Sequence, residues 1–381
     1  MSQSNQEELD LFRDNVKRFI ETEIKPNIEQ WEREEITPRS LWHKLGQQGL
    51  LGICLPEEYG GAGADFRFSA AVLEEFHRAN CATVGGNIAV HSEIVMHYIL
   101  NHGSEKQKRD YLPRMISGEC IGAIAMTEPG AGSDLQGIRM RAQAEDDHYR
   151  LNGSKTFITN GQHCDLVIVV ARTRNGEPGS RSTTLFLVDT DTPGFERGRN
   201  LEKIGQHSSD TSELFFHDVC VSANAILGEL DRGFSVLMGE LQRERLIIGV
   251  NTVASAEGIL DQTATYVKER EVFGKTLAEL QNTKFKMAEM ATEVRIHRAF
   301  VEECKTLLLA GQLDVATASM AKLSGSEMLG RVADGCLQLH GGYGYMREYD
   351  VARAFVDARV QRIYGGTSEI MKELISRAVL Q

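Results

Sequence analysis

The spacing of apolar residues changes twice along the chain, near Cys120 and again after Gly233. Before the first point and after the second, apolar side chains recur every three or four residues, which is the period of an amphipathic helix. Between the two points, the apolar runs are short, rich in β-branched and aromatic residues, and separated by Gly, Asn, Asp and Pro, as in antiparallel strands joined by turns. A chain with this pattern folds as helices, then a small β unit, then helices again.

The 381 residues are enough for two or three domains. We predict a mainly α fold with a central β domain: an N-terminal helical domain over 1–119, an antiparallel β domain over 120–228 and a C-terminal helical bundle over 229–381. Earlier helices are predicted around 67–80 and 86–116, and strands around 149–154, 166–171, 184–189 and 214–221. Long helices are predicted in the last segment at 234–268, 281–310, 313–339 and 368–379.

Charge and composition exclude several classes of function. The formal net charge of −12 argues against nucleic acid as a partner, because phosphate backbones bind basic surfaces. No apolar run approaches the ~20 residues that a membrane-spanning helix needs, so no stable membrane insertion is predicted. The acidic, amphipathic N-terminus has neither the layout of a signal peptide nor the acid-poor character of a transit peptide, and a cytoplasmic location is expected.

The cysteines support neither a disulfide framework nor a zinc site. Their number is odd, their spacing is wide, and no C-x-x-C occurs. We expect small buried thiols in a reducing compartment, and we predict no metal site. The seven are Cys54, Cys81, Cys120, Cys164, Cys220, Cys304 and Cys336.

The segment 125–134 reads AMTEPGAGSD and is the most informative short stretch. Glycines in such a loop let backbone N–H groups approach a phosphate, so a nucleotide-binding loop is one interpretation. However, the glycine spacing of the dinucleotide-binding fingerprint is absent, and the following residues lead into strands rather than a long helix. Taken alone, the loop is equally compatible with a plain turn.

Four further segments follow this loop, and their order carries more information than any one of them. They are 155–161 (KTFITNG), 270–275 (REVFGK) with Gln281, 338–344 (QLHGGYG) and 364–370 (YGGTSEI). The five segments together resemble the acyl-CoA dehydrogenase family, and the resemblance extends from PEEYGG at 56–61 to the last helix. It implies the three-domain architecture of that family, in which the C-terminal domain is a four-helix bundle.

The resemblance also implies bound FAD. In the family, the segment matching 125–134 contacts the flavin and the CoA arm, and the one matching 155–161 lies against one face of the isoalloxazine ring. The segment matching 270–275 contacts the FAD bound by a neighbouring subunit. Phe157 stands where most relatives have Trp, so the stacking area is smaller. The FAD-binding residues implied are Met126, Thr127, Gly132, Ser133, Phe157, Ile158, Thr159, Arg270, Phe273, Gln281, Gln338, Leu339, Gly341, Gly342, Thr367 and Glu369.

Two residues in these segments also have plainer interpretations. Arg270 offers a bidentate cation for a pyrophosphate, but a solvated cation at a helix end has the same local sequence. His340 invites a catalytic role, yet no second histidine, cysteine or acid stands at metal-ligand spacing from it. A packed or backbone-bonded histidine is the favoured interpretation.

The position of the catalytic base departs from the common family pattern. Removing an α-proton from a thioester requires a carboxylate. The segment 364–370 resembles the family's closing turn over the flavin, and many relatives carry this acid there, directly after the tyrosine, where this chain has Gly365. The base therefore comes from another element, or the chain is inactive.

The predicted helix after Gly233 offers Glu244 as a candidate. Leu237, Leu241, Glu244 and Ile248 are spaced by four, three and four residues, so Glu244 interrupts an apolar stripe on one helix face. The helix alone is also compatible with an acid at the edge of that stripe, paired in solvent with one of the flanking arginines, because charge runs usually mark solvated faces.

The family resemblance favours Glu244. In the long-chain and isovaleryl-CoA dehydrogenases the closing turn also has glycine, and the base is a Glu followed by Arg-Leu, as in RERL at 243–246 here. The resemblance implies that Glu244 removes the α-proton while the β-hydride passes to flavin N5, giving a trans-2-enoyl-CoA. The flavin ribityl hydroxyl and the N–H of Gly365 would bind the thioester oxygen. The substrate-binding residues implied are Ser133, Phe234, Leu241, Glu244, Arg245, Tyr364 and Gly366.

The resemblance further implies an electron-transfer flavoprotein as acceptor, a homotetramer built as a dimer of dimers, and a medium-chain, long-chain or branched acyl-CoA substrate. Two other functions remain open. One is a flavin oxidase or monooxygenase on the same scaffold, and the other is a non-catalytic flavoprotein that binds acyl-CoA.

Overall fold

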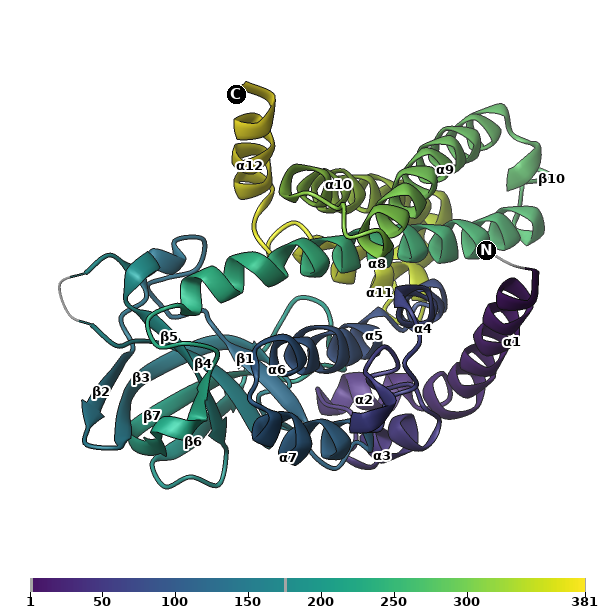
Figure 1. Ribbon diagram of the computed structural model, residues 1–381. Helices are drawn as coiled ribbons and strands as arrows, with labels where there is room; N and C mark the ends of the chain where they lie inside the picture. The colour runs from purple at the N-terminus through teal and green to yellow at the C-terminus, as the bar shows by residue number, and fades with distance from the viewer. Residues whose placement is uncertain (1–2, 175–176, 381) are drawn as a thin grey trace.

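The computed structural model describes residues 3–174 and 177–380. Figure 1 shows one long helix, α8 (Gly233–Glu269), running across the molecule, with the N-terminal helices and the sheet below it and α9, α10 and α12 above it. The elements thus follow the order helices, sheet, helices, which confirms the prediction from hydrophobic period. Within the described residues, no helix is long and apolar enough to cross a bilayer.

The N-terminal segment consists of short helices. The helix predicted around 86–116 is divided at Gly103, because Ser104 begins a new helix. The Ser104 side chain accepts the N–H of Gln107, whose side chain accepts the N–H of Ser104, so two unpaired donors are satisfied reciprocally. The helices are α1 (Gln3–Phe19), η1 (Ile20–Ile24, π), α2 (Ile28–Glu34), α3 (Ser40–Gln47), α4 (Phe66–Arg78), α5 (Ala82–Ile88), η3 (Ala89–Val95, π), α6 (Met96–His102) and α7 (Glu105–Ile116).

An eight-stranded sheet follows, in the order β6-β7-β3-β2-β4-β5-β8, with β1 beside β4. Its pairs are mostly antiparallel as predicted, but β4 is parallel to β1 and, through one residue pair, to β2. Parallel neighbours need a long connection, which β2 and β3 provide here. The strands are β1 (Gly122–Ala125), β2 (Arg141–Glu145), β3 (His148–Thr159), β4 (Leu166–Arg172), β5 (Thr183–Asp189), β6 (Phe195–Asn200), β7 (Thr211–Ser222) and β8 (Ile226–Leu227).

Strand β4 lies between two apolar cores. Leu166 and Ile168 belong to the large core shared with the helices, whereas Val167 and Val169 belong to the separate core of the β domain. This division follows from the period of two along a strand, which sends successive side chains to opposite faces. The sheet is therefore fixed against the helical part by one complete face of its most buried strand.

The C-terminal helices agree with the predicted long helices to within two residues at each end. Helix α10 contacts α8, α9, α11 and α12, and Figure 1 shows the end of α12 standing away from the rest. Helix α11 was not among the predicted long helices, because its buried positions Val351, Ala354 and Ala358 include two small side chains that give a weak period. The elements after α8 are β9 (Glu271–Val272), β10 (Lys275–Thr276), α9 (Gln281–Leu309), α10 (Val315–His340), α11 (Asp350–Val360) and α12 (Ser368–Leu380).

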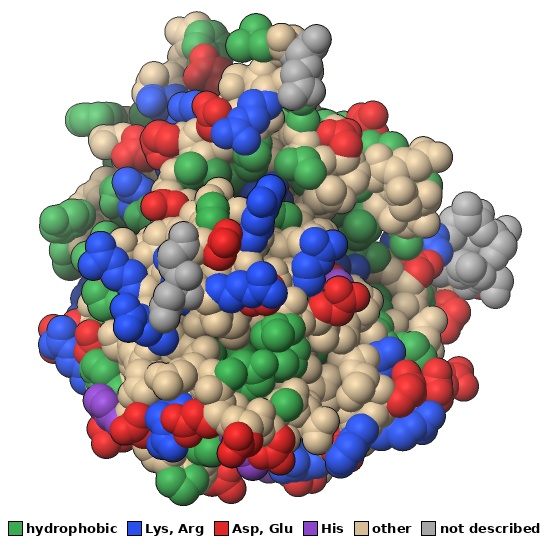
Figure 2. Space-filling model, turned by 60° about the vertical axis from the view of Figure 1, so that its left-hand side comes forward, with side chains coloured by type: hydrophobic (Ala, Val, Ile, Leu, Met, Phe, Trp, Pro, Cys, Tyr) green, Lys and Arg blue, Asp and Glu red, His purple; other side chains and the backbone are tan. Residues whose placement is uncertain are grey.

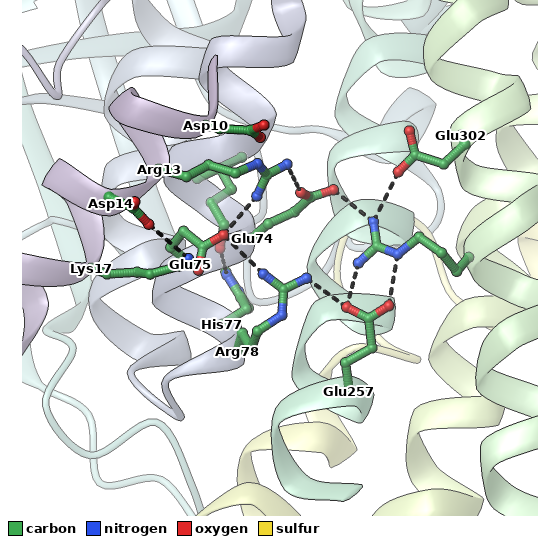
Figure 3. A network of polar contacts seen from close by, with 12 residues as sticks. Asp10, Arg13, Asp14, Lys17, Glu74, Glu75, His77, Arg78, Glu257 and Glu302 are labelled. Atoms are coloured by element: carbon green, nitrogen blue, oxygen red, sulfur yellow. Dashed lines mark hydrogen bonds and ion pairs between the residues drawn. The ribbon is translucent and has the colours of Figure 1, made fainter. Parts of the chain in front are cut away.

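A buried ionic network joins α1, α4, α8 and α9 (Figure 3). At its centre, the Glu74 carboxylate is contacted by Arg13, by Arg298 at 2.7 Å and by Lys305 at 3.1 Å. Arg298 also contacts Glu257 at 2.7 Å. Burial would raise the pKa of Glu74, but these cations outweigh it and hold that pKa well below its usual range.

Candidate active site

The predicted base, Glu244, is buried in the middle of the molecule. Glu244 is only 6 % exposed. The alternative interpretation, that this acid lies in solvent at the edge of the apolar stripe, is therefore wrong. Its Oε1 accepts a hydrogen bond of 3.0 Å from the hydroxyl of Tyr98 on α6. Leu237 and Ile248 on the same face are also buried, while Leu241 is half-buried. Glu244 is therefore a carboxylate within an apolar stripe, as its spacing predicts.

The surroundings of Glu244 suit a base that works near neutral pH. Burial raises the pKa of Glu244 to about 7, because a carboxylate loses its hydration. The charge of Glu240, one turn earlier, contributes to this raised pKa. The hydrogen bond from Tyr98 and the charge of Arg245 act in the opposite direction. A carboxyl group with this pKa is ionised in a large fraction of molecules at neutral pH and still binds a proton readily.

The closing turn lies directly against the helix face that carries Glu244. Gly365 and Gly366 both have positive φ, at 63° and 96°. A β-carbon on Gly365 would lie 2.3 Å from Cδ1 of Ile248, which is one helical turn after Glu244. A longer side chain at 365 would force Ile248 to move. The structure therefore accounts for glycine at the position where many relatives carry their acid.

Two buried cations stand beside this turn. Lys322 on α10 donates a hydrogen bond of 2.5 Å from Nζ to the carbonyl oxygen of Gly366. Burial, and then the charge of Arg245, lower the pKa of Lys322 to about 8. Arg245 is 5 % exposed, and its Nε has no hydrogen-bond partner within the described residues. An unpaired buried donor is costly, so this guanidinium suits an acceptor that a ligand provides.

The glycine loop at 125–134 is anchored to β3 by a buried ion pair. Lys155 Nζ lies 2.9 Å from Glu128 Oε1 and donates to the carbonyl oxygen of Met126 at 3.0 Å. Glu128 also accepts the backbone N–H groups of Arg139 and Met140. Burial lowers the pKa of Lys155 to about 8. These contacts leave the following residues Gly132 and Ser133 exposed at the tip of a fixed loop.

Phe157 is held in an unusual conformation beside that loop. Its φ is 59°, it lies in an irregularity of the β3–β7 pairing, and its side chain is 67 % exposed. The N–H of Thr156 donates to the carbonyl of Thr127 at 2.9 Å, which brings Thr127 beside this bulge. Ile158 points into the core of the β domain, so only its backbone is available to a ligand. An aromatic side chain in a strained, exposed position is typical of a ligand contact.

A second set of predicted FAD residues lies at the far end of α8. Arg270, Gln338, Leu339, Gly341 and Gly342 line one groove with a volume of about 550 Å³. The guanidinium of Arg270 lies 5.3 Å from the centre of the Tyr343 ring, which forms part of the same groove. The sequence segments at 270 and 338 are therefore brought together.

His340 in this groove has structural partners. Its ring stacks on Tyr266 with centroids 4.1 Å apart, and its Nδ1 lies 2.8 Å from the carbonyl oxygen of Cys336. Burial lowers the pKa of His340. This geometry agrees with a packed histidine.

The two sets of residues do not meet in one chain. Glu244 and Arg270 are about 39 Å apart along the axis of α8, at a rise of ~1.5 Å per residue. Figure 1 shows the sheet at one end of α8 and β10 at the other. Phe273, in the hairpin turn after Arg270, is 98 % exposed with a φ of 51°. Gln281 is exposed at the start of α9.

The remaining predicted residues surround the closing turn or begin α8. Phe234, Tyr364 and Thr367 are partly buried, and Glu369 is exposed in the first turn of α12. Sequence reasoning missed Tyr98, Lys322 and the Lys155–Glu128 pair. Only the pair carried a signal, because both members lie within segments that resemble the family. The described residues contain no cluster of three or more groups that could hold a metal ion.

Comparisons with known proteins cover nearly the whole chain. Three family models match in order: the acyl-CoA dehydrogenase N-terminal domain over 6–119, the middle domain over 123–219 and the C-terminal domain over 231–380. Long-chain specific acyl-CoA dehydrogenase from Sus scrofa is 50 % identical over 374 residues, which cover 98 % of this chain and 86 % of that protein.

Solved structures show the same fold. An acyl-CoA dehydrogenase from Geobacillus kaustophilus is 45 % identical with a TM-score of 0.94, covering 98 % of both chains. A glutaryl-CoA dehydrogenase from Mycobacterium smegmatis in complex with FADH2 is 31 % identical with a TM-score of 0.92, covering all of this chain and 95 % of that one. The fold and site thus define a flavin-dependent oxidoreductase. The chain belongs to the acyl-CoA dehydrogenase family, whose members use FAD.

The residues present fit a flavin nucleotide. Phe157 offers an exposed aromatic face, and a β-carbon at Gly130 or Gly132 would meet open space, so backbone there is accessible to a ligand. Figure 2 shows Lys and Arg side chains gathered in a band above an apolar patch on the side of the molecule that carries the sheet. A local band of cations suits a phosphate-bearing ligand even though the net charge of the chain is −12.

Proposed function

We propose that this protein oxidises an acyl-CoA thioester to the trans-2-enoyl-CoA, with Glu244 as the base that removes the α-proton. The observation that carries the proposal is a buried carboxylate, with a pKa of about 7, on the helix face against which the closing turn packs. The apolar stripe around Glu244 suits an acyl chain, and the missing side chain at Gly365 lets the closing turn pack against Ile248 on that stripe.

The chain's own groups have distinct tasks in this reaction. Glu244 binds the α-proton on a carboxylate oxygen. The N–H of Gly365 donates to the thioester oxygen as negative charge develops there, in the manner of an oxyanion hole. Lys322 holds the turn through the carbonyl of Gly366. Arg245 would orient the helix or the CoA side of the substrate. The flavin, when bound, supplies the acceptor for the β-hydride.

The FAD would be held between two chains. Thr127, Phe157 and Thr159, with Met126, Gly132 and Ser133, would contact the flavin end within one subunit. Arg270 and the groove at 338–342 lie at the end of α8 away from the sheet, and Arg270 is about 39 Å along the helix axis from Glu244. We propose that a second subunit contributes them, so that the functional unit is at least a dimer and the assembly a dimer of dimers.

The acyl substrate is proposed to be medium-chain, long-chain or branched, with an electron-transfer flavoprotein as acceptor. Support comes from the relative at 50 % identity, which is named as long-chain specific. A panel of straight and branched acyl-CoAs compared by kcat/KM tests this choice.

The test of the base is Glu244→Gln. We expect the folded, FAD-loaded variant to lose nearly all dehydrogenase activity, because glutamine cannot accept the proton. The measurement is anaerobic bleaching of the flavin band at roughly 450 nm on addition of acyl-CoA. Glu302→Gln, an exposed acid on α9, is the matched control and should bleach as the wild type does. Substantial bleaching by Glu244→Gln would show that another group is the base.

A flavin oxidase is the second candidate function. Rapid peroxide formation from acyl-CoA in air, with no acceleration by an electron-transfer flavoprotein, would favour it. A flavin that acyl-CoA does not reduce at all would instead indicate a non-catalytic binding protein.

A further inference from the structure

Two carboxylates on α8 face α6, and each is held by donors from that helix. Glu240 Oε1 accepts from Asn101 at 2.9 Å and lies 2.8 Å from His102 Nε2. One turn later, Glu244 Oε1 accepts from Tyr98 at 3.0 Å. Helix α6 follows directly on the π-helical turn η3, and π-helical turns are frequent at functional sites. The contact between α6 and α8 is therefore built around these two acids.

The hydroxyl of Tyr98 acts as a constant donor. Tyr98 is fully buried, and burial together with the charge of Glu244 raises the pKa of its hydroxyl well above 10. The phenol therefore keeps its proton near neutral pH. Within the described residues, Glu244 has this one hydrogen bond, and it goes to Oε1. Oε2 is left available for another partner.

We infer that Tyr98 is a positioning residue for the dehydrogenation: its hydroxyl fixes Oε1 of Glu244 so that Oε2 is presented to the α-carbon of the substrate. This inference rests on the proposed function. It gives a role to Tyr98, which lies on an N-terminal helix, outside both the closing turn and the predicted FAD-binding segments. A tyrosine that merely fills the core would affect folding but not proton transfer.

The pH dependence separates these two roles, provided that the neighbouring charges are accounted for. On α8, Glu240 and Arg245 face Glu244. Burial would raise the pKa of Glu240, but the hydrogen bonds from His102 and Asn101 hold it below its ordinary value, so its charge is constant near neutrality. On α10, Lys322 lies near Arg245 and has a pKa of about 8. The lower limb of the pH profile therefore reports Glu244.

The experiment is the pH profile of kcat and kcat/KM for the Tyr98→Phe holoenzyme. Losing the hydrogen bond should move the lower limb upward by about one unit, which corresponds to about a fivefold lower kcat/KM at pH 7. We expect kcat to remain lower at high pH as well, because the carboxylate is no longer oriented. The KM for acyl-CoA and the flavin content should stay close to those of the wild type.

Tyr111→Phe is the matched control. Tyr111 also donates to a carboxylate, Asp189, at 3.0 Å, but from α7 to the end of β5. Its profile should coincide with that of the wild type. Tyr98→Gln retains an N–H donor and should lie between the wild type and Tyr98→Phe, and it replaces Tyr98→Phe if the latter does not fold.

The outcomes distinguish this inference from the function on which it rests. If Glu244→Gln is inactive and the profiles of both Tyr98 variants coincide with the wild type, Glu244 remains the base and Tyr98 is only a core residue. If Glu244→Gln stays active, the base assignment itself fails, and the role of Tyr98 fails with it.

Discussion

A carboxylate that water would keep ionised at neutral pH is buried here with a single hydrogen bond. For Glu244, burial is the main cause of a pKa of about 7, and the hydrogen bond from Tyr98 recovers only part of the lost hydration. The cost of this arrangement is borne by the folded state whenever Glu244 is charged. A group that is useful for proton transfer is thereby a source of instability.

This cost predicts the effect of Glu244→Gln on stability. The pKa of Glu244 is higher in the folded chain than in the unfolded one. The native state therefore loses stability as pH rises from the ordinary pKa of a glutamate to about 7. Glutamine has no such dependence. We expect the variant to match the wild type near pH 4.5 and to exceed it by at most ~3 kcal/mol above pH 7. Melting temperatures across this range, with Glu302→Gln as control, measure the difference. An equal gap at all pH values would contradict a raised pKa.

Sequence reasoning could find Glu244 but not its partner. Glu244 interrupts a local apolar stripe, and its neighbours carry the RERL pattern, so the signal lies within a few residues. Tyr98 lies 146 positions away, and no local pattern indicates which side chains two distant helices bring together. For the same reason, the Lys322–Gly366 contact between α10 and the closing turn could not be predicted.

At the scale of elements, the ionic network fixes how the N-terminal helices sit on the C-terminal ones. Glu74 from α4 is 2 % exposed in its side chain and meets cations from α1 and α9. Glu257 from α8 accepts from Arg78 and Arg298, which connects the same set of helices. Breaking a buried pair leaves an uncompensated charge, so each member depends on the others.

Glu74→Gln should therefore destabilise the protein strongly. We expect a loss of ~3 kcal/mol at pH 7, because three cations lose their common partner. The folded-state pKa of Glu74 is below its ordinary value, so the stabilisation is present above that ordinary value and is lost as pH falls further. Chemical denaturation at pH 7 and pH 4 should show a smaller difference at pH 4. Glu302→Gln, whose side chain is 50 % exposed, should cost little in comparison, and equal losses for the two variants would contradict a buried network.

Helices and strands could be predicted from the sequence where the apolar spacing repeats over many residues or where a capping pattern marks an end. The long C-terminal helices repeat their apolar spacing over many turns, and they were found to within two residues. Helix α11 is short and buries small side chains, so its period is weak. The division between α6 and α7 depends on the capping box at Ser104, which competes with continuation of the helix. The parallel pairing of β1 with β4 depends on strand order, which alternation along one strand does not encode.

At the scale of the whole molecule, the two sets of FAD residues predict that active sites are shared between chains. We also propose domain boundaries after 119 and 228, close to the limits of the three family models. The base and the flavin face would come from one subunit and Arg270 from the next. Each chain would therefore serve two nucleotides.

Subunit mixing tests this arrangement. Glu244→Gln and Arg270→Ala should each be nearly inactive alone, the second through loss of FAD. When the two variants are co-expressed with different tags and the mixed pairs are isolated, one site of each pair contains both native residues. We expect such pairs to recover about half of the wild-type activity per pair. Recovery close to zero would show that Arg270 serves the nucleotide of its own chain.

The uninterrupted length of α8 has a consequence for how the sequence can change. The helix carries the base in its first half and ends at Glu269, directly before Arg270, without a kink-producing proline between them. One inserted residue would rotate everything beyond it by about 100° and shift it by about 1.5 Å. Such an insertion would turn the groove at the far end away from a neighbouring nucleotide without altering the base. Substitutions on α8 away from Glu244 and Arg245 leave this spacing unchanged, whereas an insertion or deletion would alter the relative orientation of the two sites.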